Sequence, residues 1–196
     1  MRKLSILALM IWSAQGWAGQ VFCSPGAGGV PVPTYSETIQ ISQSGMPGLV
    51  WVGATDSGQQ WAEVLTLNNT WNSYNGGLYP PFARYDSGLP SSVNVLAPLP
   101  VTDGTTGSIV GWTIYVGFGM LSAQAQQEVQ ARRAFLNQNQ AAMIANGTWN
   151  SAYASDDQEK WALAQQDLTQ NQRYWVSTTV PYINCNPPTQ GGGGAN

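Results

Sequence analysis

Five short apolar runs, each bounded by turn residues, constrain the fold of this chain more than any other feature. They are rich in β-branched and aromatic residues, and clusters of Gly, Asn, Asp and Pro separate them. Such runs at this spacing are typical of a small antiparallel sandwich or barrel. The five runs are residues 38–42, 49–52, 61–67, 93–96 and 112–116. We therefore predict a β-rich domain over residues 35–121.

The chain changes character after residue 121, where Ala and Gln become frequent. We predict a first helix over residues 122–146, with Ser122 as its N-cap and Asn146-Gly147 as its stop. Val129, Leu136 and Met143 recur at heptad spacing and give this helix one apolar stripe, with Phe135 and Ile144 beside it.

A second helix is predicted from Ser155, because Ser155-Asp156-Asp157-Gln158 has the pattern of a capping box. Residues 174–183 then predict an extended segment that returns to the β body. The fold class is therefore α+β, an antiparallel β-sandwich-like body followed by two C-terminal α-helices. The predicted parts are a signal peptide (1–18), a Pro/Gly-rich arm (19–34), the β-rich domain (35–121), a helical part that returns to the β body (122–186) and a disordered Gly-rich tail (187–196).

The first eighteen residues predict a secretion signal. Arg2 and Lys3 form a positive n-region, residues 4–12 form an apolar h-region, and small residues stand at Gly16 and Ala18. We predict cleavage after Ala18. An uncleaved anchor is the alternative, but the apolar run is too short to span a bilayer as a helix. We expect a bacterial protein that is secreted to the periplasm or the cell surface, with no transmembrane segment in the mature chain.

Two cysteines, Cys23 and Cys185, lie near the two ends of the predicted mature chain. In an oxidising compartment two lone cysteines are expected to pair, and this bridge would close a loop around nearly the whole domain. A redox or nucleophilic cysteine is the alternative. It is disfavoured because neither cysteine has a CxxC partner or a histidine to activate it. Lipid attachment to Cys23 is excluded because Phe22 stands where a small residue is needed.

The low charge and the lack of histidine exclude several functions. Without Arg2 and Lys3, five of the seven basic residues remain against ten acidic ones, which gives the mature chain a net charge of about −5. The bases form no stripe, so we expect no nucleic-acid partner. Serine catalysis through histidine is impossible, and there is no Ser-x-x-Lys motif.

We expect no metal ion and no cofactor. Asp156, Asp157 and Glu159 form the one acidic cluster, and they lie where a helix N-terminus favours negative charge, so we interpret them as helix capping. A calcium ion held largely by backbone carbonyls stays open at three turns, around Asp56, Asp86 and Asp103.

Paired carboxylates could act as in glycosidases, which hold two acids at a fixed separation. The acids of the β body are Glu37, Asp56, Glu63, Asp86 and Asp103. Most of them lie beside Gly or Ser, where an aspartate bonds its own turn backbone. We therefore expect no catalytic residue and keep a carboxylate-dependent hydrolase only as a remote alternative.

Aromatic residues are the positive signal. We expect Trp51, Trp61 and Trp112, inside strand-like runs, to pack in the core. The segment from Trp71 to Tyr79 is instead a turn-rich stretch in which aromatics alternate with Asn and Gly, and exposed rings there could stack on sugars or bind a protein. Four aromatic residues are the candidate partner-binding or ligand-binding residues: Trp71, Tyr74, Tyr79 and Tyr85.

Residues 61–119 resemble a small module found in large secreted and pilus-associated bacterial proteins. That module passes from a "W-x-x-Y-x-G" turn through a "P-x-x-x-Y-x-x-G-x-L-P" stretch to a strand ending in "I-Y-V-G-Y-G". Phe118 replaces the last tyrosine. The resemblance implies an extracellular β-sandwich of adhesin or appendage type and carries over no catalytic residue. The matching residues are Trp71, Tyr74, Gly76, Pro81, Tyr85, Gly88, Leu89, Pro90 and residues 114–119.

Three hypotheses of function follow. The first is a non-enzymatic binding or structural component of a bacterial cell-surface appendage or of its assembly machinery, with other appendage proteins or further copies of itself as partners. The second is a carbohydrate-binding module that uses Trp71, Tyr74 and Tyr79, with a glycan as ligand. The third is the remote hydrolase. Gly117 and Gly119 also suit a strand that bends or lets another backbone approach closely.

Overall fold

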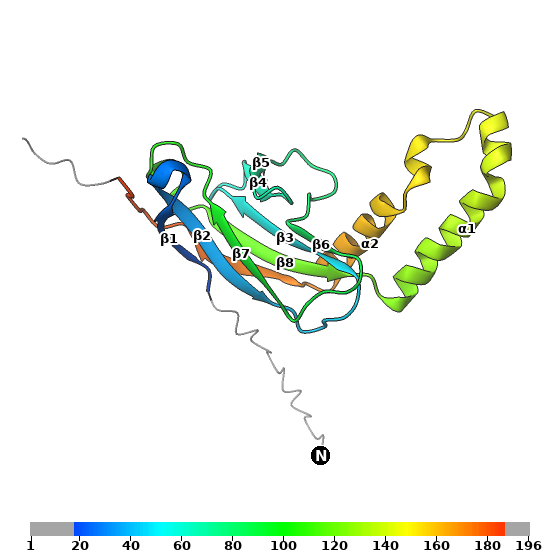
Figure 1. Ribbon diagram of the computed structural model, residues 1–196, viewed down its shortest axis with the longest axis horizontal. Coiled ribbons are helices and arrows are strands. Elements are labelled where there is room, and N and C mark those ends of the chain that lie inside the picture. The colour runs from blue at the N-terminus through cyan, green and yellow to red at the C-terminus, as the bar shows by residue number, and fades with distance from the viewer. Residues whose placement is uncertain (1–17, 187–196) are drawn as a thin grey trace, which may run out of the picture.

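The computed structural model describes residues 18–186, so the predicted signal peptide (1–18), apart from Ala18, and the predicted Gly-rich tail (187–196) lie outside the described residues. Within this range nine strands form two antiparallel sheets, and two helices lie between the last two strands. The predicted α+β class, a sandwich-like body with two C-terminal helices, is confirmed. Figure 1 shows the two helices projecting together from one end of the body.

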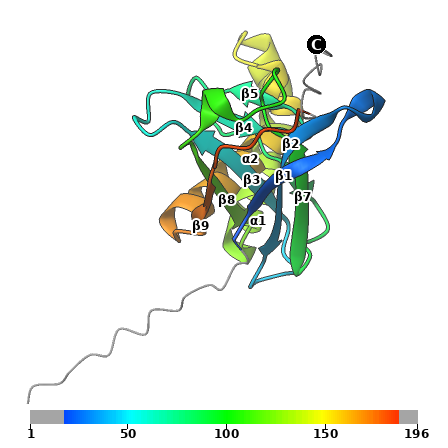
Figure 2. The ribbon, with the colours of Figure 1, turned by 90° about the vertical axis from the view of Figure 1, so that its left-hand side faces the viewer.

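The smaller sheet has the order β1-β2-β7 and the larger has the order β5-β4-β3-β8-β9, with β6 also paired to β3. Figure 2 shows them as two layers. The smaller sheet consists of β1 (Gln20–Pro25), β2 (Pro31–Gln40) and β7 (Ser92–Pro98). The larger consists of β3 (Gly48–Thr55), β4 (Ala62–Leu65), β5 (Trp71–Ser73), β6 (Ala83–Tyr85), β8 (Thr113–Met120) and β9 (Tyr174–Thr179).

The main core lies between the two sheets. β7 alternates buried and exposed residues along its length, as expected for a strand with one face toward the core. β3 is different, because Val50 and Val52 face the core whereas Leu49 and Trp51 pack in a second cluster against a helix. The continuous apolar run at residues 49–52 thus belongs to a strand that is buried on both faces.

The helix in that second cluster is α2 (Asp157–Gln170), which lies unusually close to β8. A Cβ atom on Gly119 would lie 1.8 Å from the carbonyl oxygen of Ala164, and one on Gly117 would lie 2.6 Å from the carbonyl oxygen of Arg173. The Asp167 carboxylate also accepts a hydrogen bond from the Met120 backbone N–H at 2.9 Å. The prediction that these two glycines admit another backbone is confirmed.

A buried polar cluster joins the two sheets. Tyr35 on β2 donates its hydroxyl hydrogen bond to Glu37, and its oxygen lies 2.7 Å from the hydroxyl oxygen of Ser177 on β9. The indole N–H of Trp175 donates to the other oxygen of Glu37 at 3.4 Å. Desolvation by burial, followed by the Glu37 charge, raises the pKa of Tyr35 far above its usual range. These bonds fix the position of β9 against β2.

The predicted arm at residues 19–34 differs from the structure. Residues 20–25 and 31–34 belong to β1 and β2, which pair antiparallel around a short 3-10 turn at Ala27–Gly29. Prolines are tolerated there because Pro25 lies on the edge strand β1, and Pro31 and Pro33 lie in the part of β2 that precedes its pairing with β7 at Thr34. The Pro/Gly-rich stretch is therefore the first hairpin of the smaller sheet.

The two helices form a hairpin. α1 (Ala123–Ala145) begins as predicted, since the Ser122 hydroxyl accepts a hydrogen bond from the Ala125 N–H at 3.1 Å. The predicted capping box is wrong in detail, because α2 begins at Asp157 and the Ser155 hydroxyl accepts from the Asp157 N–H at 3.0 Å. α1 contacts α2, and the buried residues of α1 are Val129 and Leu136.

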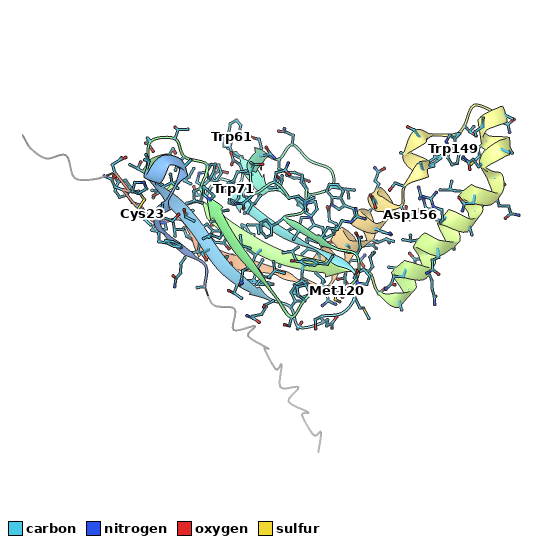
Figure 3. All side chains as sticks on the ribbon, viewed as in Figure 1. Cys23, Trp61, Trp71, Met120, Trp149 and Asp156 are labelled. Carbon is cyan, nitrogen blue, oxygen red and sulfur yellow. A yellow bond between two sulfur atoms is a disulfide. The ribbon has the colours of Figure 1, made fainter. Side chains whose placement is uncertain are left out.

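The acids interpreted as helix caps act mainly in ion pairs. Arg133 binds Asp156 at 2.7 Å and donates to the Tyr153 carbonyl oxygen at 2.7 Å. Arg132 binds Glu159 at 3.2 Å. Figure 3 shows Asp156 between the two helices. These bonds join α1 to the start of α2, so the charges of this region lie at the root of the hairpin.

The predicted disulfide between Cys23 and Cys185 is present. It joins β1 to the segment after β9, across 162 residues of sequence, at the end of the body opposite the helical hairpin (Figure 3). No described cysteine is free. Among residues 18–186, no helix is long and apolar enough to cross a membrane.

Replacing Gly119 tests the close contact between α2 and β8. Gly119→Ala places a methyl group against the backbone of α2, and we expect a loss of about 1–3 kcal/mol of unfolding free energy, as for other overpacked sites. Urea unfolding followed by circular dichroism measures this. Gly107→Ala is the matched control, because its nearest neighbour, the Thr105 hydroxyl oxygen, lies 3.4 Å from the added Cβ. Equal stability of both variants would contradict the close packing.

Removing the disulfide tests how much the bond between Cys23 and Cys185 stabilises the folded protein. Cys23→Ala combined with Cys185→Ala frees a loop of 162 residues, and the loop-entropy model gives a loss of about 4–5 kcal/mol. The wild-type protein under reducing conditions should unfold at the same urea concentration as this double variant. A loss below about 1 kcal/mol would show that the bridge does little to restrict the unfolded chain.

Candidate functional site

The structure separates the four candidate aromatic residues into two pairs. Trp71 and Tyr85 pack against the main core, and the Trp71 indole N–H donates to the Pro98 carbonyl oxygen at 2.8 Å. Tyr74 and Tyr79 lie together on the opposite, outer face of the larger sheet, with ring centroids 4.7 Å apart. Only this second pair lies where a ligand could contact both rings.

Tyr74 and Tyr79 line a groove of about 310 Å³ on that outer face, which we call the aromatic groove. Its walls include three further aromatic residues: Trp51 on β3, Tyr115 on β8 and Tyr174 on β9. Tyr174 is 50% exposed. The volume lies at the lower end of the range of about 300–1,000 Å³ that is typical of small-molecule sites.

The floor of the aromatic groove is hollow because it contains glycine. Gly53 on β3 pairs directly with Tyr115 on β8, so the two residues share one face of the sheet. A Cβ on Gly53 would meet only the Glu63 carbonyl oxygen at 3.3 Å and a Val64 methyl at 3.9 Å, which leaves open space above it. The Tyr115 ring thus stands beside a gap in the sheet surface.

The Tyr79 backbone anchors the wall of the groove. Its carbonyl oxygen accepts hydrogen bonds from two indole N–H groups, those of Trp51 and Trp161, each at 2.7 Å. Its N–H donates to the Gln165 side-chain oxygen on α2 at 2.6 Å. The loop that carries Tyr74 and Tyr79 is therefore fixed to both the sheet and α2, and the groove is preformed.

Sequence reasoning missed Tyr115 and Tyr174 as groove residues. Tyr115 stands between Ile114 and Val116, whose side chains face the core, so strand alternation places its ring on the outer face. The sequence therefore contained a signal for Tyr115. It contained no signal for Tyr174, because the position of Tyr174 depends on the pairing of β9 with β8.

The three tryptophans expected in the core lie in three different environments. Trp112 packs against the main core and Trp51 is buried in the second cluster. Trp61 is 69% exposed, so its prediction is wrong. Its N–H and carbonyl both bond Asp56 at the turn between β3 and β4, which places it outside the paired strands (Figure 3).

The acids of the β body lie mostly in structural roles. The Asp56 carboxylate accepts from the Gln60 and Trp61 N–H groups, and Asp103 accepts from the Thr105 N–H and hydroxyl. These bonds lower the pKa of both aspartates. Asp86 binds Arg84 at 3.0 Å. Within residues 18–186 there is no cluster of three His, Cys, Asp or Glu residues that could hold a metal ion.

Glu63 borders the aromatic groove through its backbone. Its side chain shares the inner face of β4 with Leu65, which is fully buried in the core. One carboxylate oxygen is buried without a hydrogen-bond partner, and desolvation by burial raises the pKa of this acid. The lining of the groove on its open side therefore comes from uncharged side chains.

No protein-family model matches this chain, and the comparisons with curated proteins and with solved structures found no match either.

Replacing Glu63 tests its buried position. A raised pKa in the folded state means that ionisation opposes folding, so the wild-type protein loses stability as pH rises through the folded-state pKa. Gln cannot ionise. We therefore expect the stability of Glu63→Gln relative to wild type to rise between about pH 4 and pH 7.

Urea unfolding at a series of pH values measures this difference. Asp103→Asn is the control with the opposite sign, because the lowered pKa of Asp103 stabilises the wild-type protein above the unfolded-state pKa and this variant loses that contribution. A Glu63→Gln difference that stays constant or falls with pH would contradict a buried carboxylate without a partner.

Proposed function

We propose that this chain is a non-enzymatic, secreted binding or structural component of a bacterial cell-surface appendage, of pilus or adhesin type, or of its assembly machinery. The proposal rests above all on the helical hairpin. A rigid, disulfide-stapled sandwich carries this hairpin away from its own body, so the tip is free to meet a partner (Figure 1).

The composition of the hairpin supports a protein partner. Residues 134–155 contain no charged residue, although they span most of α1 and the whole tip. Phe135 and Ile144 on α1 are 60% and 56% exposed. Aromatic and apolar residues with few charges are typical of the centre of protein interfaces.

The bonds at the root of the hairpin indicate that the hairpin projects in a fixed position. The bonds of Arg132 and Arg133 to Asp156 and Glu159 hold α1 against the start of α2. The two glycines of β8 hold α2 against the sheet. A preorganised surface loses less entropy on binding than a flexible one, which favours a stable assembly.

The resemblance of residues 61–119 to modules of secreted and pilus-associated bacterial proteins also supports the proposal. Those residues supply β4, β5, β6 and β8 of the larger sheet and β7 of the smaller one. The disulfide suits an oxidising compartment outside the cytoplasm.

Fractionation of the source bacterium tests the proposal. We expect the mature protein to sediment with sheared surface appendages or with their assembly complexes. Phe135 and Ile144 are nine residues apart and lie on opposite sides of α1, so each is replaced by Asp in a separate variant. The variant whose side chain lies at the interface should release the protein into the soluble fraction, because a charge at an interface centre opposes binding. Val30→Asp is the control, since Val30 is a similarly exposed apolar residue on the sandwich. A wild-type protein that remains soluble, monomeric and without a cross-linked partner would contradict the proposal.

A further inference from the structure

We infer that the aromatic groove is a binding site for a neutral glycan. The inference does not depend on the tip of the hairpin, because the groove lies on the sandwich beside the C-terminal half of α2. It therefore goes beyond the proposed appendage role.

The groove presents aromatic faces to a ligand. Tyr79 and Tyr174 are exposed at its rim, and the half-buried rings of Tyr74 and Tyr115 line it. Sugar rings have apolar C–H faces that pack on aromatic rings, while the tyrosine hydroxyls offer hydrogen bonds at the ring edge. The glycine floor at Gly53 gives such a ring a place to enter.

The polar groups of the groove suit hydroxyl ligands. Thr55 on β3 adds a hydroxyl group to those of the tyrosines. The hydroxyls of Tyr74 and Thr169 already donate to backbone carbonyl oxygens, so toward a ligand they act as acceptors. A hydroxyl both donates and accepts, as sugar hydroxyls do. Among the described residues that line the groove, Glu63 is the one charged residue, and strand alternation with the buried Leu65 places its side chain on the inner face. None of these lining residues therefore offers a charge to an anionic or cationic ligand. The complementary ligand is neutral.

A proline-rich peptide is the other ligand that aromatic grooves bind. Such a peptide offers carbonyl acceptors and few N–H donors, so its groove must supply donors. The Trp51 and Trp161 indole N–H groups already donate to the Tyr79 carbonyl oxygen. The tyrosine hydroxyls remain, and they accept as well as donate. A proline-rich peptide has few donors to match their accepting oxygens, whereas a glycan has many, which favours the glycan.

Calorimetric titration of the mature protein tests the site with four probes. Cellohexaose and chitohexaose are neutral, hexagalacturonate is anionic, and a proline decamer represents the peptide. We expect heat of binding with at least one neutral hexasaccharide and a parallel change in tryptophan fluorescence, since Trp51 lines the groove. No response to either neutral sugar, or a response to the proline decamer or the anionic sugar alone, would overturn the inference.

Variants locate the binding. Tyr115→Ala and Tyr174→Ala should each weaken it about tenfold, which corresponds to about 1.4 kcal/mol. Tyr182→Ala is the matched control, since Tyr182 is 64% exposed and lies outside the groove. An equal loss in the control would place the ligand elsewhere.

Gly53→Val gives a second, independent readout. It keeps every aromatic ring but fills the floor, and its backbone lies in an ordinary strand conformation. We expect it to abolish binding while thermal unfolding shows a folded protein. Unchanged affinity in folded Gly53→Val would overturn the groove as the site. Appendage association, measured separately with the hairpin variants, is not affected by this result.

Discussion

The contact of α2 with the glycines of β8 is the interaction on which the rest of this structure depends. Because Gly119 has no side chain, the backbone of α2 at Ala164 can approach the sheet closely enough to contact it directly. Gly117 leaves room for the Leu168 side chain of α2 and for the backbone of Arg173, just after the helix. That approach buries Leu49 and Trp51 on the outer face of β3. It also brings Gln165 to the Tyr79 N–H and so fixes the wall of the aromatic groove.

The same contact links two surfaces with different chemistry. The hairpin tip is uncharged and partly apolar, and we propose that it meets protein. The groove combines aromatic rings with hydroxyl groups, and we propose that it meets sugar. Both surfaces are held by α2, one at its N-terminal end through the arginine ion pairs and one at its C-terminal half through Leu168 and Thr169. A chain with both would join a glycan to an assembly.

The strand pattern, the Ser122 cap and the role of the two glycines could be predicted from the sequence because each depends on local chemistry. The disulfide could be predicted because the chain has only two cysteines, which leaves one possible pairing. The first hairpin was missed, since prolines at an edge strand look the same in sequence as prolines in a loop. The sequence identified two of the four tyrosines that line the groove. Tyr74 and Tyr79 stood out by their neighbours, whereas Tyr174 joins them only through the pairing of β9 with β8, which no local pattern encodes.

Residual dipolar couplings of the backbone amides of the mature protein test the central claim most directly, which is that the sandwich and the hairpin form one rigid body through α2. We predict that a single alignment tensor fits the couplings of β3, β8, α2 and α1 together. A second, smaller tensor for the amides of the helices would show that the hairpin moves independently of the sandwich, and the seat of α2 on the glycines of β8 would then not hold it.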